Sequence, residues 1–190
     1  MQTLLYILFL IGISLLLNVF FIYPVFITVL AFFKKSRKTD SDFQPAISIL
    51  IAVRNEEKVI RQRIENITEL DYDKNKIKLF VCSDSSTDKT NSILEELNGK
   101  YTWLNISFSQ ERLGKAGILN SLIEDVDTDI VIFSDANTVF RKDAVKNLVR
   151  EFVDNKIGVV CGHLILTDDE VYPSASVEEV KYWSFETQIK

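Results

Sequence analysis

The sequence has little of the residue chemistry on which many metalloproteins and redox enzymes depend. Its 190 residues include one histidine, His163, and two cysteines, Cys82 and Cys161. The cysteines lack the paired spacing of zinc or redox sites, and each lies in an apolar run, so we expect two buried thiols in a reducing compartment. His163 also lies in an apolar run, where a core or edge role is favoured over catalysis.

Glycine-rich phosphate-binding motifs are also absent. No G-x-G-x-x-G sequence follows an apolar strand-like run, which removes the usual dinucleotide fingerprint. Gly114-Lys115 does not complete a P-loop, because Ser109 stands where the first glycine is needed and Ala116 stands where Ser or Thr must follow the lysine. Lys115 could still meet a phosphate as a point charge, or it could be a solvated loop lysine.

Charge is missing from residues 1–33, which are mostly Leu, Ile, Phe and Val. This run predicts a transmembrane helix, and it lacks the basic start and small-residue cleavage site of a signal peptide, so we expect an uncleaved anchor. A helix over residues 4–33 would reach roughly 45 Å, against a hydrocarbon core of roughly 30 Å. It must therefore tilt, kink near Pro24 or enter the headgroups. Asn18 is either a helix-contact residue or a tolerated amide.

A basic and polar linker, residues 34–45, follows the anchor and begins Lys-Lys-Ser-Arg-Lys. The positive-inside rule then predicts a cytoplasmic soluble domain, with the N-terminus outside the cell membrane. The chain has 22 Lys and Arg against 27 Asp and Glu, and removing the four linker charges leaves 18 against 27, a balance of −9. This acidic balance argues against a nucleic-acid partner.

Residues 46–190 alternate apolar runs with amphipathic stretches. Strands are predicted at 47–52, 77–82, 103–108, 129–134 and 157–166. Helices are predicted around Ile64, Leu94 and Leu119, over about 141–154 and over 177–190. This order predicts an α/β domain, a mostly parallel sheet with helices on both faces, in which the alternating run at 103–108 is an edge strand.

Polar clusters follow three of the predicted strands. Asn55 and Glu56 follow the first, Asp84 the second, and Asp135-Ala-Asn the fourth. A lone acidic loop would more simply cap the next helix, but the carboxyl ends of parallel strands meet at one edge, where ligands gather. Together with Lys115, these groups favour a nucleotide diphosphate bridged to the protein by Mg²⁺ or Mn²⁺.

Four segments in succession, residues 46–57, 81–88, 114–120 and 133–138, resemble motifs of family-2 glycosyltransferases. The similarity is greatest to membrane-associated members related to hyaluronan, chitin and poly-N-acetylglucosamine synthases. It implies a GT-A fold and an inverting transfer from a nucleotide-sugar donor, usually a UDP-sugar, with a divalent metal. The acceptor would be a glycan or a lipid-linked molecule.

The resemblance also implies roles for residues that match the nucleotide-binding motifs. Ala52, Arg54 and Glu56 would lie beside the nucleotide base. Asp84 would lie against the base or the ribose, and Lys115 would approach the diphosphate.

The same resemblance implies a metal site and a base. Asp135 would hold the metal and donor as the first member of an Asp-x-Asp signature, and Asn137 in the second position would offer an oxygen ligand without charge. An inverting transfer needs a general base, which in the family is an acidic residue of a later motif. We expect that base beyond Lys190, since residues 168–170 match no base motif.

Three functions are compatible with these residues. The first is a membrane-anchored glycosyltransferase in which residues 46–190 form the donor-binding part, inactive or weakly active alone. The second is a non-catalytic nucleotide-sugar-binding or scaffold module that recruits a partner polypeptide. The third is a nucleotidyltransferase, which would release pyrophosphate rather than UDP.

Overall fold

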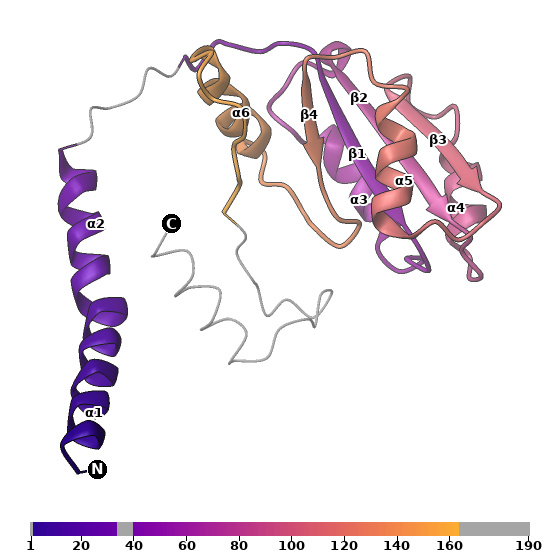
Figure 1. The fold of residues 1–190 in the computed structure, drawn as a ribbon. Coiled ribbons are helices and arrows are strands. Elements are labelled where there is room, and N and C mark those ends of the chain that lie inside the picture. Colours follow the sequence, from indigo (N-terminus) through magenta and orange to yellow (C-terminus); the bar gives the residue numbers. More distant parts are fainter. Residues whose placement is uncertain (1, 34–39, 164–190) are drawn as a thin grey trace. The chain divides into compact units, whose positions relative to one another are not determined.

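The computed structural model describes residues 2–33 and 40–163, and a parallel sheet dominates residues 40–163 (Figure 1). Its strands are β1 (Ile47–Val53), β2 (Ile77–Asp84), β3 (Leu104–Ser109) and β4 (Ile130–Phe133). They lie in the order β3-β2-β1-β4, and each neighbouring pair is parallel. The first four predicted strands are confirmed, and the run predicted as an edge strand forms the edge strand β3.

The central strand β1 is buried on both faces, which explains its unbroken apolar sequence. Because side chains alternate along a strand, Ile47, Ile49 and Ile51 enter one core cluster while Leu50 enters another. Each fully buried side chain of this size contributes about 1.5–3 kcal/mol. The second cluster also contains the buried thiol of Cys82, as predicted.

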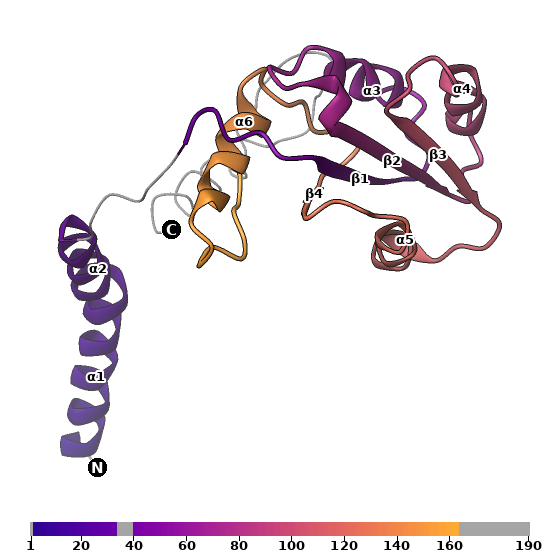
Figure 2. The same ribbon diagram turned by 90° about the horizontal axis from the view of Figure 1, so that it is seen from above.

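Helices cover both faces of the sheet, as the apolar strands predicted. Figure 2 shows α3 (Ile60–Thr68) and α4 (Thr90–Leu97) on one face and α5 (Gly114–Ile123) on the other. Helix α3 buries the predicted stripe of Ile60, Ile64 and Ile67, and α5 buries Ile118 and Leu122. The sheet is therefore the middle layer of a three-layer α/β domain.

The strand order reverses once along the chain. From β1 the chain moves outward to β2 and β3, and α5 then carries it across the opposite face to β4, on the other side of β1. In open α/β sheets, ligands bind outside the carboxyl ends of the two strands that flank such a reversal. Here the loops at that place are residues 54–57, after β1, and residues 134–137, after β4.

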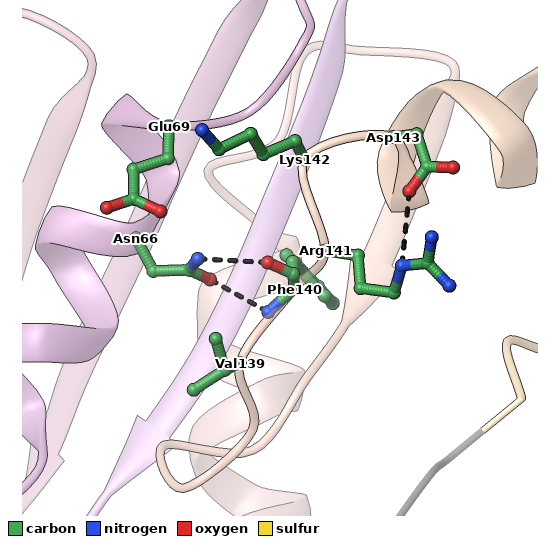
Figure 3. A pocket seen from close by; sticks show the side chains of 7 residues that line it. All are labelled: Asn66, Glu69, Val139, Phe140, Arg141, Lys142 and Asp143. Atoms are coloured by element: carbon green, nitrogen blue, oxygen red, sulfur yellow. Dashed lines mark hydrogen bonds and ion pairs between the residues drawn. The ribbon is translucent and has the colours of Figure 1, made fainter.

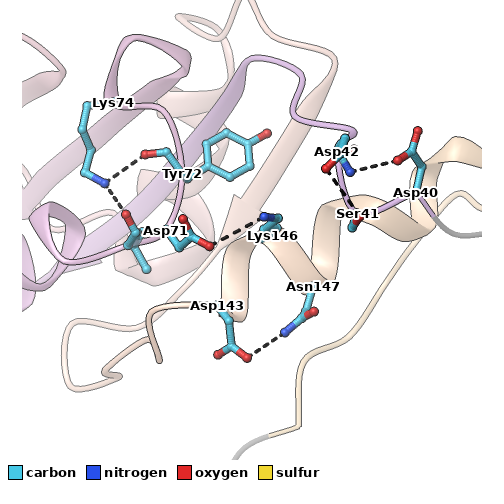
Figure 4. Close-up of polar contacts among 10 residues, drawn as sticks. Asp40, Ser41, Asp42, Asp71, Tyr72, Lys74, Asp143, Lys146 and Asn147 are labelled. Atoms are coloured by element: carbon cyan, nitrogen blue, oxygen red, sulfur yellow. Dashed lines mark hydrogen bonds and ion pairs between the residues drawn. The ribbon is translucent and has the colours of Figure 1, made fainter.

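Polar contacts join segments at the amino edge of the sheet (Figure 4). The Tyr72 hydroxyl donates to the carbonyl of Pro45 at 2.5 Å, and burial raises the pKa of Tyr72 to about 12. Lys74 donates to the carbonyl of Tyr72 at 2.9 Å, and Lys146 lies 3.7 Å from Asp71. These contacts hold the segment that leads into β1, as well as α6 (Ala144–Val149), beside the loop before β2.

The predicted fifth strand is wrong for the residues described. Residues 157–163 form no strand, Val159 is 81% exposed and the thiol of Cys161 is exposed rather than buried. Gly158 and Gly162 flank the apolar run, and glycine weakens a strand because it costs more backbone entropy and offers no side chain to pack. His163 is exposed, and residues 164–166 lie outside the described residues.

The helix predicted at about 141–154 is present in a shorter form. It consists of α6 followed by a 3₁₀ turn, η3 (Arg150–Val153). Val145 and Val149 of α6 face the same core cluster as α3 and α4. The predicted helix at 177–190 lies outside the described residues.

The N-terminal part of the chain is one apolar helical stretch. It runs as α1 (Gln2–Leu17), a π-helical turn η1 (Asn18–Ile22) and α2 (Tyr23–Phe32). An 18-residue window within the helical stretch Gln2–Leu30 has a mean hydropathy of 2.6, so by length and composition the helix could cross a membrane. The π turn ends with the Tyr23 N–H bonded to the Asn18 carbonyl, directly before Pro24, which has no N–H to donate. The helix is thus irregular directly before Pro24, near the place of the kink that was one of the three predicted alternatives.

Candidate functional site

The loops after β1 and β2 are bonded to each other at the carboxyl edge. Asn55, at φ 54°, lies in the left-handed region that Asn tolerates better than most residues. Its N–H donates to Ser86 Oγ at 3.1 Å, and its side-chain oxygen accepts the N–H of Thr87 at 2.8 Å. Asn55, in the first motif, therefore joins the loop after β1 to the loop after β2.

A second set of bonds continues this network into α4. Asp88 accepts the N–H of Thr90 at 2.9 Å and the N–H of Glu57 at 3.2 Å. In return the Glu57 carboxylate accepts the N–H of Lys89 at 3.0 Å. Partial burial opposes ionisation of Asp88, but hydrogen bonds from Thr90 and Glu57 outweigh it and lower its pKa. Asp88 thus joins the loop after β1 to Thr90, the first residue of α4.

At this edge, two other carboxylates influence the ionisation of Glu56. The pKa of Glu56 is raised, first by burial and then by the negative charges of Asp88 and Asp135. Glu56 follows β1, Asp88 follows β2 and Asp135 follows β4. Groups that follow the three predicted strands therefore influence one another at this edge, with Asp88 acting on Glu56 where the sequence predicted Asp84.

Lys115 forms an ion pair with Asp135. Both side chains are more than half exposed, at 61% and 54%, so the pair itself contributes little to stability. Lys115 is the second residue of α5, which begins at Gly114 with φ 73°. The pair places an ammonium and a carboxylate together at the carboxyl end of β4.

Asp84 has a buried position that the sequence did not predict. Its side chain is 4% exposed, and its two oxygens accept the N–H groups of Leu113 at 2.7 Å and Gly114 at 3.0 Å. A carboxylate at the N-terminus of a helix is favoured by the helix dipole. Asp84 therefore ties the end of β2 to the start of α5 and sets the position of Lys115.

The tip after β4 has oxygen donors that suit a hard divalent cation. Asp135 and Asn137 are both exposed and lie on one turn, in which the Thr138 N–H bonds the Asp135 carbonyl at 3.3 Å. Within residues 2–33 and 40–163, no three His, Cys, Asp or Glu side chains gather as a metal cluster. One carboxylate and one amide fit Mg²⁺ or Mn²⁺, which commonly take few protein ligands and complete their shell with phosphate and water.

The remaining predicted residues lie at the same edge with less polar contact. Ala52 is half-buried near the end of β1, where it packs beside the α5 cluster. Arg54 is exposed on the loop that follows. Sequence reasoning missed Asp88 as a partner of the first motif, since that contact depends on the pairing of β1 with β2. It also missed Arg63 and Asn66, although polar residues beside the apolar stripe of α3 were a visible signal.

A surface cleft of about 480 Å³ lies elsewhere, beside the end of α3 (Figure 3). None of the predicted site residues lines it; its walls are formed by Asn66, Glu69, Val139, Phe140, Arg141, Lys142 and Asp143. Two of the lining residues, Val139 and Phe140, follow the Asp135-Ala-Asn tip in the chain, but the tip itself does not line the cleft.

The profile of glycosyl transferase family 2 matches residues 48–190, well over half of the chain. The chain belongs to this family. The beta-monoglucosyldiacylglycerol synthase of Nostoc sp. is 34% identical over 118 residues, which are 61% of this chain and 25% of that protein. The poly-beta-1,6-N-acetyl-D-glucosamine synthase of Staphylococcus aureus is 30% identical over 118 residues, which are 62% of this chain and 28% of that protein. The chain thus spans less than a third of these relatives.

Solved structures confirm the predicted GT-A fold. The mannosyltransferase PcManGT of Pyrobaculum calidifontis, in complex with GDP-Man and Mn²⁺, matches with a TM-score of 0.66 at 26% identity over 76% of this chain. The match covers 44% of that chain. Residues 1–349 of S. aureus TarS match with a TM-score of 0.51 at 25% identity, over 58% of this chain and 32% of that one.

Proposed function

We propose that the protein is a membrane-anchored inverting glycosyltransferase and that this chain carries its donor-binding part. The donor is a nucleotide-diphosphate sugar, with UDP as the nucleotide, and the acceptor is a glycan or a lipid-linked molecule. One observation carries the proposal: the Lys115–Asp135 ion pair lies at the carboxyl end of β4, and Glu56 follows the neighbouring strand β1, where the strand order reverses. That is where a sheet of this topology binds its ligand.

The relatives support the substrate class. The similar mannosyltransferase is bound to GDP-Man and Mn²⁺, and TarS residues 1–349 were also solved with UDP, at 25% identity and a TM-score of 0.50. The choice of UDP for this chain rests on TarS and on the resemblance of the motifs to those of UDP-sugar enzymes.

Each predicted residue has a role in this proposal. Ala52, Arg54 and Glu56 line the nucleotide base at the end of β1. Asp84 faces the base or ribose with the oxygen lone pairs left after it has accepted the two N–H groups of α5. Lys115 leaves its pair with Asp135 to meet the negative charge of the diphosphate, which a flexible ammonium can follow.

Asp135 and Asn137 would hold Mg²⁺ or Mn²⁺. The ion, when bound, stabilises the negative charge that develops on the diphosphate leaving group. The carboxylate of Asp135 would stay at the end of β4. The ammonium of Lys115 would lie beside the diphosphate leaving group and offset its negative charge. In an inverting transfer, the acceptor oxygen attacks the anomeric carbon opposite the diphosphate and a base takes the hydroxyl proton. Glu57, Asp84 and Asp88 already accept backbone N–H groups. From the resemblance to the family, the base in this proposal is an acidic residue of a later motif.

The proposed organisation has three parts: residues 1–33 as the anchor, 34–45 as the linker and 46–190 as the donor-binding domain. The basic linker would face the cytoplasm with the N-terminus outside, following the positive-inside rule. A helix over Gln2–Leu30 that is long and apolar enough to cross a membrane supports the anchor. The enzyme would then act at the membrane surface, where a lipid-linked or growing glycan acceptor is available.

Calorimetric titration of the full chain in detergent with UDP tests the proposal. We expect binding heat in the presence of Mn²⁺ and none after addition of EDTA. Equal heat with and without the metal would contradict the proposed site. With a nucleotide-sugar donor, release of UDP indicates sugar transfer, whereas release of pyrophosphate would indicate a nucleotidyltransferase.

A further inference from the structure

Two buried polar side chains of α3 hold the segment that carries Asp135 and Asn137. We propose that Arg63 and Asn66 are positioning residues: they fix the main chain of the tip segment, defined as residues 134–140, and thereby set its affinity for the metal-bound diphosphate. The second half of this inference rests on the proposed function. The first half rests only on the contacts that Arg63 and Asn66 make with residues 134–140.

Arg63 reaches the start of the tip segment from inside the protein. It is fully buried, and its guanidinium donates through Nη2 to Ser134 Oγ at 3.0 Å and through Nη1 to Asn66 Oδ1 at 3.1 Å. Its Cζ atom lies 4.2 Å from the centroid of the Phe140 ring. One planar side chain thus contacts both ends of the tip segment, which a lysine could not do because it lacks the fork.

Asn66 holds the other end of the tip segment by its backbone. Its amide nitrogen donates to the Phe140 carbonyl at 2.9 Å, and its amide oxygen accepts the Phe140 N–H at 2.8 Å (Figure 3). Asn66 is 6% exposed, so these bonds are largely shielded from water. The side chain satisfies both backbone groups of one residue, as a neighbouring strand would, and so fixes the path of the chain there.

The middle of the tip segment is anchored by packing. Ala136 is 5% exposed and belongs to the core cluster on the α3 face. Asp135 and Asn137 on either side of it are exposed. The main chain of the tip is therefore held at Ser134, Ala136 and Phe140, while the two donor side chains point away from the core.

The same helix also reaches the nucleotide side of the site. The N–H groups of Val59 and Ile60 donate to the Glu56 carbonyl at 3.1 and 2.9 Å. Helix α3 thus begins at the first motif and contacts the tip segment through its next turns. A rigid element that carries both halves of a site can hold them in a fixed relation, and Arg63 and Asn66 are the contacts that extend α3 to the second half.

The buried guanidinium of Arg63 should matter more for the position of the tip segment than for the stability of the fold. A buried charge is costly to desolvate, and an apolar side chain of similar volume often supports stability equally well. Directional bonds to Ser134 and Phe140, however, fix a register that apolar packing cannot. Arg63→Met should therefore disturb the tip segment more than it disturbs the fold.

The test compares Arg63→Met, Arg63→Lys and Asn66→Ala with wild type in the full chain. The measurements are amide hydrogen exchange of peptides over residues 134–142 and the UDP dissociation constant in Mn²⁺. Leu97→Val, in the core at the far end of α4, controls for a general loss of stability. We expect faster exchange confined to 134–142 in Arg63→Met and Asn66→Ala, and affinity weaker by roughly 10- to 100-fold, the usual cost of losing an outer-shell partner. Arg63→Lys should fall between these variants and wild type.

Two results would overturn the inference. One is faster exchange spread equally over the sheet peptides, as Leu97→Val would give, because that marks a merely structural role. The other is a UDP affinity unchanged from wild type despite faster exchange at 134–142. If the wild-type chain binds no UDP in Mn²⁺, the proposed function fails, and exchange at 134–142 still decides whether these two residues fix the tip segment.

Discussion

The two ends of β4 carry the same kind of ion pair in different surroundings. At the carboxyl end Lys115 pairs with Asp135, and before the amino end Lys78 pairs with Asp127 at 2.6 Å. Both pairs are exposed, with side-chain exposures of 61% and 54% at the first and 47% and 63% at the second. A lysine beside an aspartate is therefore not by itself a sign of a binding site.

The difference lies in the charges around each pair. A hydrogen bond from Lys78 lowers the pKa of Asp127, so one cation there balances one anion. At the carboxyl end Asp135 also raises the pKa of Glu56, together with burial and Asp88. Asp135 therefore has Lys115 as its ion-pair partner and also adds to the negative charge near Glu56, which a divalent cation would relieve. The surroundings of a charge pair indicate whether it can serve a ligand.

Removal of the acidic group at each end should give the largest contrast. Asp135→Ala is expected to weaken Mn²⁺-dependent UDP binding by roughly 100-fold, about 2.7 kcal/mol, because it deletes the charged ligand of the metal. Asp127→Ala removes the matched carboxylate and should leave the affinity unchanged. Calorimetry on both variants measures the contrast, and equal losses would show that the two ends do not differ.

Much of this contrast could be predicted from the sequence. Apolar runs identified β1, β2 and β4, and the rule that parallel strands share a carboxyl edge predicted Glu56, Asp84 and Asp135 at one edge of the sheet. The buried role of Asp84 could not be predicted, because its partners, Leu113 and Gly114, depend on where α5 begins. The exposed Cys161 was missed because an apolar run between glycines has the pattern of a strand whether or not a neighbour pairs with it.

Lys115 provides a second way to sharpen the contrast. Lys115→Met should weaken UDP binding about tenfold, about 1.4 kcal/mol, and leave the weaker binding of uridine unchanged, because uridine has no phosphate for the ammonium to meet. The matched variant at the other pair, Lys78→Met, should bind UDP as wild type does. A loss of uridine binding as large as the loss of UDP binding would instead place Lys115 near the base.

Asp88 tests whether the network at the carboxyl edge stabilises the fold. Asp88→Asn leaves one acceptor oxygen for two N–H groups, so the free energy of unfolding at neutral pH should fall by about 1 kcal/mol. Because the folded-state pKa of Asp88 is lowered, this stabilisation is complete above the unfolded value of about 3.9 and is lost as pH falls through the folded value. Urea unfolding at pH 7 and pH 3 should therefore show a smaller difference between wild type and variant at pH 3.

Asp73 is the matched control for this measurement at the amino edge. It caps a 3₁₀ turn, η2 (Lys74–Lys76), through one oxygen only, which accepts the N–H of Asn75 at 3.0 Å. Asn caps a turn about as well as Asp, so Asp73→Asn should change stability little at either pH. A pH-dependent loss in Asp73→Asn equal to that in Asp88→Asn would remove the distinction between the two edges.

The smallest effect is expected where the charge pair has no further function. Asp127→Ala should shift the midpoint of thermal unfolding by less than about 3 °C, because an exposed pair gains little Coulomb energy in water and loses side-chain entropy when it forms. The shift should shrink further in roughly 1 M salt, where the screening length is about 3 Å. Thermal unfolding followed by circular dichroism in low and high salt measures both. A large, salt-resistant loss would mean that Lys78–Asp127 is part of the folded framework, and the amino end of β4 would no longer serve as the inert counterpart of the site around Asp135.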